Sequence, residues 1–95
     1  MLRQPPKPRE IARQPLFEQE LMLLGLDSVS ADEFTEGAEW VLSRDAEYGT
    51  KIAKNVWFLP ISRSSLGTYA SLYYTFDDKK VYFLSIKRAP EEVEE

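Results

Sequence analysis

The spacing of apolar residues changes midway along this chain, from a helical period of about 3.6 residues to a strand period of about 2. In the N-terminal half, Phe17, Leu21 and Leu24 recur at helical spacing after Pro15. Proline suits the first turn of a helix, because its missing N–H would be unpaired there in any case. We therefore expect a short first helix from Pro15, preceded by a short strand over residues 10–14.

A second helix is predicted from Ser30, which matches a capping box with Glu33. Four apolar residues then form a stripe along one face of the helix, with Trp40 beside it: Phe34, Ala38, Val41 and Leu42. Gly49 marks the exit from this helical segment.

The C-terminal half contains three predicted strands, over residues 56–61, 69–76 and 81–86. The last two form a hairpin, because Asp77-Asp78-Lys79-Lys80 supplies turn-forming residues between them. Pro60 lacks a backbone N–H, so it is expected at a sheet edge or a bulge. The segment 81–86 is apolar on both faces, which is typical of an interior strand.

The element order is therefore β-α-α-β-β-β, and the predicted fold class is α+β. Two N-terminal helices pack on one face of a four-stranded, mainly antiparallel sheet, and the other face is open. If Leu72 faces the helices, Tyr73 lies on the open face with Tyr69 and Ser71. We expect a flexible proline-rich arm over residues 1–8, one domain over residues 9–89 and an acidic tail over residues 90–95.

Composition narrows the chemistry that this fold can carry. The chain contains no histidine and no cysteine, which removes the commonest general base and the commonest metal ligands. We therefore expect no metal site and no cofactor. No apolar run approaches the length of a membrane span, and no leader segment is evident, so we expect a cytoplasmic protein without membrane contact.

The net charge of −4 is unevenly distributed. Residues 14–50 carry nine acidic and one basic side chain, whereas residues 51–88 carry seven basic and two acidic ones. The predicted sheet is thus locally basic in an acidic protein, and local fields rather than totals steer a polyanion. The alternative is that the helices simply contain the glutamates and the strands the lysines.

The element order and the stretch from Tyr69 to Arg88 resemble the RelE/ParE superfamily of bacterial toxins. The segment Arg44 to Gly49 is similar to the turn that follows the helical pair in that family. The resemblance covers about residues 9–93 and implies a type II toxin that a cognate antitoxin holds inactive. RelE-like members cleave messenger RNA on the ribosome, and ParE-like members inhibit DNA gyrase.

The resemblance implies site residues for an RNA endonuclease that needs no histidine, because the RNA 2′-hydroxyl is the nucleophile. The implied catalytic residues, which would stabilise charge on the phosphate, are Lys87, Arg88 and Arg63. Lys51 and Lys54 would contact RNA, and Tyr73 would stack a base. Each of these residues is also compatible with a solvated surface position, and Tyr73 with packing under a partner.

A second hypothesis is a non-catalytic protein-binding module on the same fold, either a gyrase inhibitor or an inactive toxin homologue. Ser71 stands where the family has an arginine, and no C-terminal tyrosine follows Lys87 and Arg88. Both hypotheses predict an antitoxin segment lying over the domain. The sequence leaves the oligomeric state open.

Overall fold

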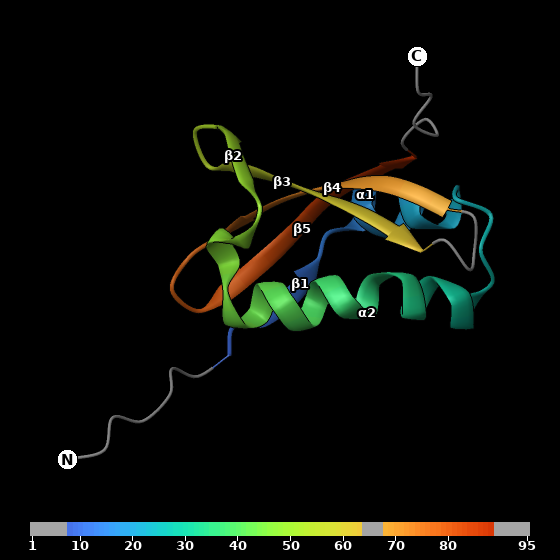
Figure 1. Ribbon diagram of the computed structural model, residues 1–95, viewed down its shortest axis with the longest axis horizontal. Coiled ribbons are helices and arrows are strands. Elements are labelled where there is room, and N and C mark those ends of the chain that lie inside the picture. The colour runs from blue at the N-terminus through green and yellow to red at the C-terminus, as the bar shows by residue number, and fades with distance from the viewer. Residues whose placement is uncertain (1–7, 64–67, 89–95) are drawn as a thin grey trace.

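The computed structural model describes residues 8–63 and 68–88 (Figure 1). Most of the predicted arm and the whole predicted acidic tail lie outside these residues. In chain order the elements are β1 (Glu10–Arg13), α1 (Pro15–Met22), α2 (Ser28–Arg44), the 3-10 turn η1 (Ala46–Tyr48), β2 (Thr50–Ala53), β3 (Val56–Arg63), β4 (Thr68–Phe76) and β5 (Lys80–Arg88).

The sheet differs from the prediction in the number of its strands. Within the described residues it has five strands in the order β1-β5-β4-β3-β2, and β1 runs parallel to β5 while the other pairs are antiparallel. The α+β class is confirmed, but the four-stranded description is wrong because it omitted β2. All four residues of β2 are exposed, so its sequence has no apolar alternation to identify it. Asn55, with φ 60°, turns β2 into β3.

The predicted β4–β5 hairpin is confirmed. The carboxylate of Asp77 accepts hydrogen bonds from the backbone N–H groups of Lys79 and Lys80, both at 2.8 Å. The Asp77 N–H donates to the Lys80 carbonyl at 2.9 Å. One short side chain thus satisfies the turn that the sequence indicated.

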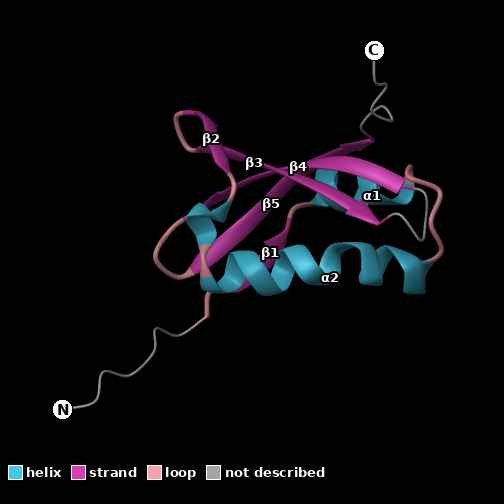
Figure 2. Cartoon of the chain, viewed as in Figure 1, coloured by secondary structure: helices cyan, strands magenta, loops and turns pink. Residues whose placement is uncertain are grey.

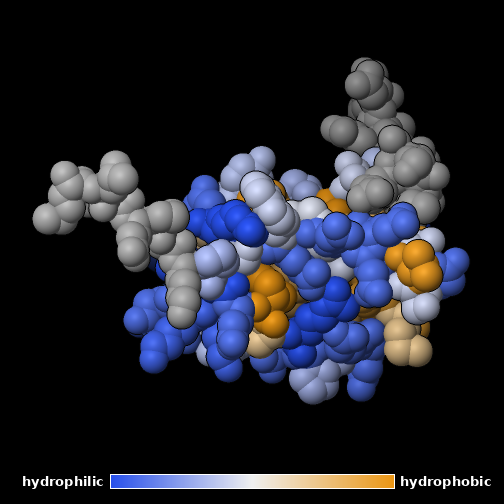
Figure 3. Space-filling view, turned by 90° about the horizontal axis from the view of Figure 1, so that it is seen from below, coloured by the Kyte–Doolittle hydropathy of each residue, from blue (hydrophilic) through white to orange (hydrophobic). Residues whose placement is uncertain are grey.

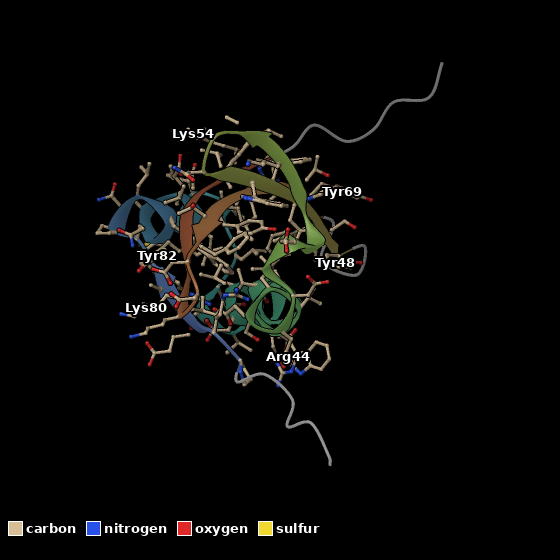
Figure 4. The ribbon with its side chains drawn as sticks, turned by 90° about the vertical axis from the view of Figure 1, so that its left-hand side faces the viewer. Arg44, Tyr48, Lys54, Tyr69, Lys80 and Tyr82 are labelled. Carbon is tan, nitrogen blue, oxygen red and sulfur yellow. The ribbon has the colours of Figure 1, made fainter. Side chains whose placement is uncertain are left out.

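The two helices occupy different places, contrary to the prediction that both cover one face of the sheet. Helix α2 crosses the sheet face, whereas α1 lies level with the strands beside β5, as two perpendicular views agree (Figure 1 and Figure 4). Helix α1 has only eight residues, and the Phe17 ring packs on Phe83 with centroids 5.2 Å apart. A helix of this length spans about 12 Å, too little to cross the sheet, so it covers the flank of one strand.

The start of α2 also differs from the prediction. Asp27 is the N-cap, and its carboxylate accepts the Ser30 N–H at 2.8 Å. Ser30 therefore lies inside the first turn and does not cap the helix, because aspartate caps as well as serine and occurs earlier in the chain. No helix in the described part of the chain is long and apolar enough to span a membrane.

The alternation of β4 is confirmed. Leu72 and Tyr74 are fully buried against the helices, and Tyr73 lies half-buried on the open face. The core beneath α2 combines residues of the helix and of the sheet: Phe34, Ala38, Leu42, Leu72, Tyr74, Val81, Phe83 and Ile86. Figure 2 shows this two-layer arrangement of α2 against the strands.

The buried Tyr74 hydroxyl holds the segment that leaves α2. It donates to the Ala46 carbonyl at 2.7 Å and accepts the Gly49 N–H at 3.1 Å. Burial raises the pKa of Tyr74, so the hydroxyl remains a donor near neutral pH. The approach is close, because a Cβ on Gly49 would lie 2.6 Å from the Tyr74 oxygen and 2.5 Å from the Phe58 carbonyl oxygen.

Replacing Tyr74 by phenylalanine should lower the free energy of unfolding by about 1–3 kcal/mol, because a carbonyl and an N–H lose their partner. Chemical denaturation followed by circular dichroism measures this change. Tyr73→Phe removes a hydroxyl from the open face one residue away and should change stability by less than about 0.5 kcal/mol. Equal losses in the two variants would contradict the assigned role of Tyr74.

Alanine should have opposite effects at two glycines of the same region. Gly49→Ala should destabilise the fold by about 1–3 kcal/mol, because the new Cβ overlaps backbone and a tyrosine oxygen. Gly37→Ala, in the exposed interior of α2 with nothing within 4 Å of its Cβ, should gain up to about 1 kcal/mol. Thermal melts of both variants test the pair, and a stabilising Gly49→Ala would refute the close approach.

Candidate functional site

Lys87, a predicted catalytic residue, is bound to a buried carboxylate. Its ammonium forms an ion pair with Glu20 of α1, whose side chain is 9% exposed, while that of Lys87 is 61% exposed. The Ser85 hydroxyl donates to the same carboxylate at 2.6 Å, and the Ile86 N–H donates at 3.3 Å. The positive charge of Lys87 therefore compensates Glu20 and holds α1 against β5.

The protonation of Glu20 reflects two opposing effects. Burial disfavours the charged carboxylate, but the hydrogen bonds from Lys87, Ser85 and the Ile86 N–H outweigh burial and hold the pKa of Glu20 below its usual value. Glu20 is therefore ionised at neutral pH, and Lys87 has a permanent counter-charge.

Arg88 is also engaged with the first helical segment. Its guanidinium donates to the Leu24 carbonyl, just beyond the end of α1. Arg88 pairs across the sheet with the buried Ala70, and Lys87 pairs with Ser71. Because successive residues of a strand point to opposite faces, Lys87 and Arg88 do not act on the same surface.

The interior position predicted for the last strand is confirmed only for its first half. β1 pairs with β5 from Lys80 to Phe83. Beyond Phe83, α1 takes the place of a strand, and the Glu20 carboxylate accepts a backbone N–H of β5. The C-terminal end of β5, which carries Lys87 and Arg88, thus lies between β4 and helix α1 and not between two strands.

Tyr73 and Lys87 are the two predicted site residues that the structure places together. Tyr73 pairs with Ser85, and its ring packs on Phe58 with centroids 5.8 Å apart. Lys87 is the diagonal neighbour on the same open face, about 7–8 Å away between Cα atoms by the usual sheet geometry.

The other predicted cations lie elsewhere. Lys51 lies in β2 opposite Trp57, and Lys54 lies at the exposed β2–β3 turn (Figure 4). Arg63 ends β3, opposite Thr68, and its side chain lies outside what the structure describes. Trp57, the partner of Lys51, lies six residues before Arg63 in β3, which corresponds to about 20 Å along an extended strand. The structure therefore places Lys51 and Lys54 at one end of β3 and Arg63 at the other.

A groove that the sequence did not reveal runs between α2 and β3. We call it the α2–β3 groove; it has a volume of about 290 Å³ and is lined by Phe34, Gly37, Ala38, Val41, Tyr48, Leu59, Pro60, Ile61 and Ser62. A neighbouring hollow of about 430 Å³ shares Gly37 and Val41 with it and adds Glu33, Glu36 and Trp40. Figure 3 shows the face that carries α2, where hydrophobic patches interrupt a hydrophilic surface.

Two local features create this groove. Among the described strands, β2 pairs with β3 only from Val56 to Phe58, so the remainder of that β3 edge has no strand beside it. Gly37 contributes no side chain on the facing side of α2. Two features of the sequence indicated an exposed surface here. Pro60 was expected at a sheet edge, and Trp40 lies outside the apolar stripe of the helix.

Two aromatic residues beside the groove are unusually exposed. Trp40 is 61% exposed and Tyr48 is 62% exposed. The Arg44 guanidinium lies 4.4 Å from the centre of the Trp40 ring and also donates to the Trp40 carbonyl at 3.1 Å. Arg44 thereby holds the indole in place at the surface.

Neither protein-family models nor curated proteins match this chain. Among the described residues, no group of three or more Asp, Glu, His or Cys side chains is placed to hold a metal ion. The functional conclusion therefore depends on the two surfaces described above: the open sheet face with Tyr73 and Lys87, and the α2–β3 groove.

Glu20→Gln should reduce the dependence of stability on acid pH. Because the pKa of Glu20 is lower in the folded chain than in the unfolded chain, its stabilisation is complete above about pH 4.3, the unfolded value, and is lost as pH falls through the folded pKa. Urea unfolding from pH 7 to pH 3 should show a smaller decline for this variant and a loss of about 1 kcal/mol at pH 7.

Glu18→Gln on the same helix provides the control, since Glu18 is half exposed and only 3.5 Å from Arg13 in a surface pair. It should retain the wild-type acid dependence. If Glu20→Gln declines as steeply as the wild type, Glu20 does not link α1 to β5 in the assigned way.

Proposed function

We propose that this chain is a non-catalytic protein-binding module on a RelE/ParE-like scaffold, the toxin-like partner in a type II toxin–antitoxin pair. The ion pair between Lys87 and the buried Glu20 is the observation that supports this proposal most directly. It gives the principal predicted catalytic cation a structural role and a fixed counter-charge.

RNA cleavage requires cations that are free to stabilise the phosphate as negative charge develops. A carboxylate held beside Lys87 opposes that task. Arg88 is bound to the Leu24 carbonyl, and Ser71 stands at the position of the family arginine, opposite Lys87. No other described cation shares the open face close to Tyr73.

A protein partner is supported by exposed aromatic and apolar surface. Trp40 and Tyr48 are exposed beside an apolar groove, and aromatic residues at such positions are frequent anchors of protein interfaces. A cognate antitoxin is the partner that the family resemblance implies, with DNA gyrase as the target of the gyrase-inhibitor form. We place the protein in the cytoplasm, where both partners occur.

A second candidate is a ribosome-dependent messenger RNA endonuclease, favoured by one observation. Tyr73 and Lys87 lie on adjacent strands of the open face, where a tyrosine could stack a base and a lysine contact a phosphate. Lys87 retains 61% exposure despite its ion pair.

Induced expression in a bacterial host, with mapping of messenger RNA 5′ ends, separates the two functions. The binding module should produce no new 5′ ends, with or without growth arrest. A known ribonuclease toxin serves as the positive control. New ribosome-dependent ends that disappear in Tyr73→Ala but persist in Thr75→Ala, a neighbour on the same face, would overturn the binding-module proposal.

A further inference from the structure

The uncovered edge of β3 presents backbone groups beside the α2–β3 groove. The Phe58 carbonyl oxygen faces Gly49, on the β2 side, as the short distance to a Gly49 Cβ shows. Residues two apart along a strand direct their N–H and C=O groups to the same side. Pro60 and Ser62 therefore direct theirs to the edge that β2 leaves uncovered.

The backbone of this edge limits where a strand can be added, because a proline on a sheet edge removes one pairing group. Pro60 has no N–H to pair, and its place on the uncovered side costs the β3–β4 ladder no hydrogen bond. In the described part of the chain, no strand pairs with the Pro60 carbonyl or with the polar backbone groups of Ser62 on this side. A segment that pairs here would direct alternate side chains toward Leu59 and Ile61, which line the groove.

Charge favours one class of partner. Of the four acidic side chains of α2, Glu39 is paired with Arg13 and Asp32 lines a different hollow, whereas Glu33 and Glu36 line the hollow beside Trp40. The one basic side chain of the helix, Arg44, lies over the Trp40 ring. Exposed Glu36 lines the hollow next to Trp40, and exposed Glu47 precedes Tyr48. An acidic rim around an apolar floor repels nucleic acid and an acidic peptide, and it attracts a segment that combines apolar residues with Lys or Arg.

We propose that the α2–β3 groove binds an extended segment of a partner protein, which adds to the Pro60–Ser62 edge as a strand. Its apolar side chains enter the groove against Ile61 and Tyr48, Trp40 packs on one end, and its lysines or arginines face Glu36. This inference rests on the proposed protein-binding function and assigns its site and the chemistry of the partner.

The proposal is tested by selecting a phage-displayed library of random 12-residue peptides on the full chain, with counter-selection on Trp40→Ala. Enriched peptides should alternate apolar residues with Lys or Arg. For a synthetic peptide of the enriched sequence, Trp40→Ala should weaken binding about 30-fold, and Glu36→Lys about tenfold, measured by calorimetry. Both residues are exposed, so the fold should persist, which circular dichroism checks.

Leu23→Ala is the matched control. Leu23 is 80% exposed on the flank of α1, away from the groove residues. Its truncation should leave peptide affinity unchanged within about twofold.

Strand addition has a separate readout. Hydrogen exchange of the Ser62 amide should slow when the peptide binds, because that N–H gains a backbone acceptor. Methylation of alternate backbone nitrogens of the peptide should abolish binding in one register and preserve it in the other.

Several outcomes would overturn the inference. The selection could enrich no sequence, or it could enrich peptides with an acidic consensus. Trp40→Ala could leave the peptide affinity unchanged, or the Ser62 amide could exchange at the same rate with and without the peptide. Concentration-dependent dimerisation that blocks the peptide would assign the groove to a second copy instead. Peptides that perturb Tyr73 and not Trp40 would refute the groove as the binding site and leave the protein-binding function standing. New ribosome-dependent RNA 5′ ends that disappear in Tyr73→Ala would refute that function itself.

Discussion

The Tyr74 hydroxyl ties the end of α2 to the centre of the sheet, and the rest of the molecule is arranged around this contact. It reaches the Ala46 carbonyl and the Gly49 N–H, so the connection between helix and strand runs directly over a buried ring. Only glycine fits at residue 49, since a Cβ would meet the Phe58 carbonyl oxygen. The same contact sets where β2 begins and where Tyr48 emerges, and both define the α2–β3 groove.

A second polar contact in the core fixes α1. A carboxylate that leaves water is costly unless charges and hydrogen bonds compensate it. Glu20 receives an ammonium, a hydroxyl and a backbone N–H, all from three consecutive residues of β5. The backbone contribution explains why a helix can replace a strand on this side of the sheet: the carboxylate accepts the N–H that a neighbouring strand would have paired.

These two contacts divide the surface into regions of different chemistry. Along the flank of β5, cations are used to hold α1. Beneath the sheet, α2 presents acidic side chains around an apolar groove, and Arg44 lies over Trp40 instead of meeting a phosphate. The basic character of residues 51–88 is thus spread over a turn, a strand end and a helix contact. The basic residues of this half of the chain do not form one basic site, because the fold places them at different positions on the surface.

Local sequence determined the features that depend on near neighbours. The alternation of β4 set its buried and open faces, and Asp77 set the hairpin, because each depends on residues only a few positions apart. The tertiary structure alone decided the rest. Glu20 and Lys87 are 67 residues apart in sequence, and β2 has no apolar pattern of its own. The groove exists because β2 pairs with β3 only from Val56 to Phe58. Such features depend on contacts between segments that are distant in sequence, and the spacing of residues along the chain does not determine those contacts.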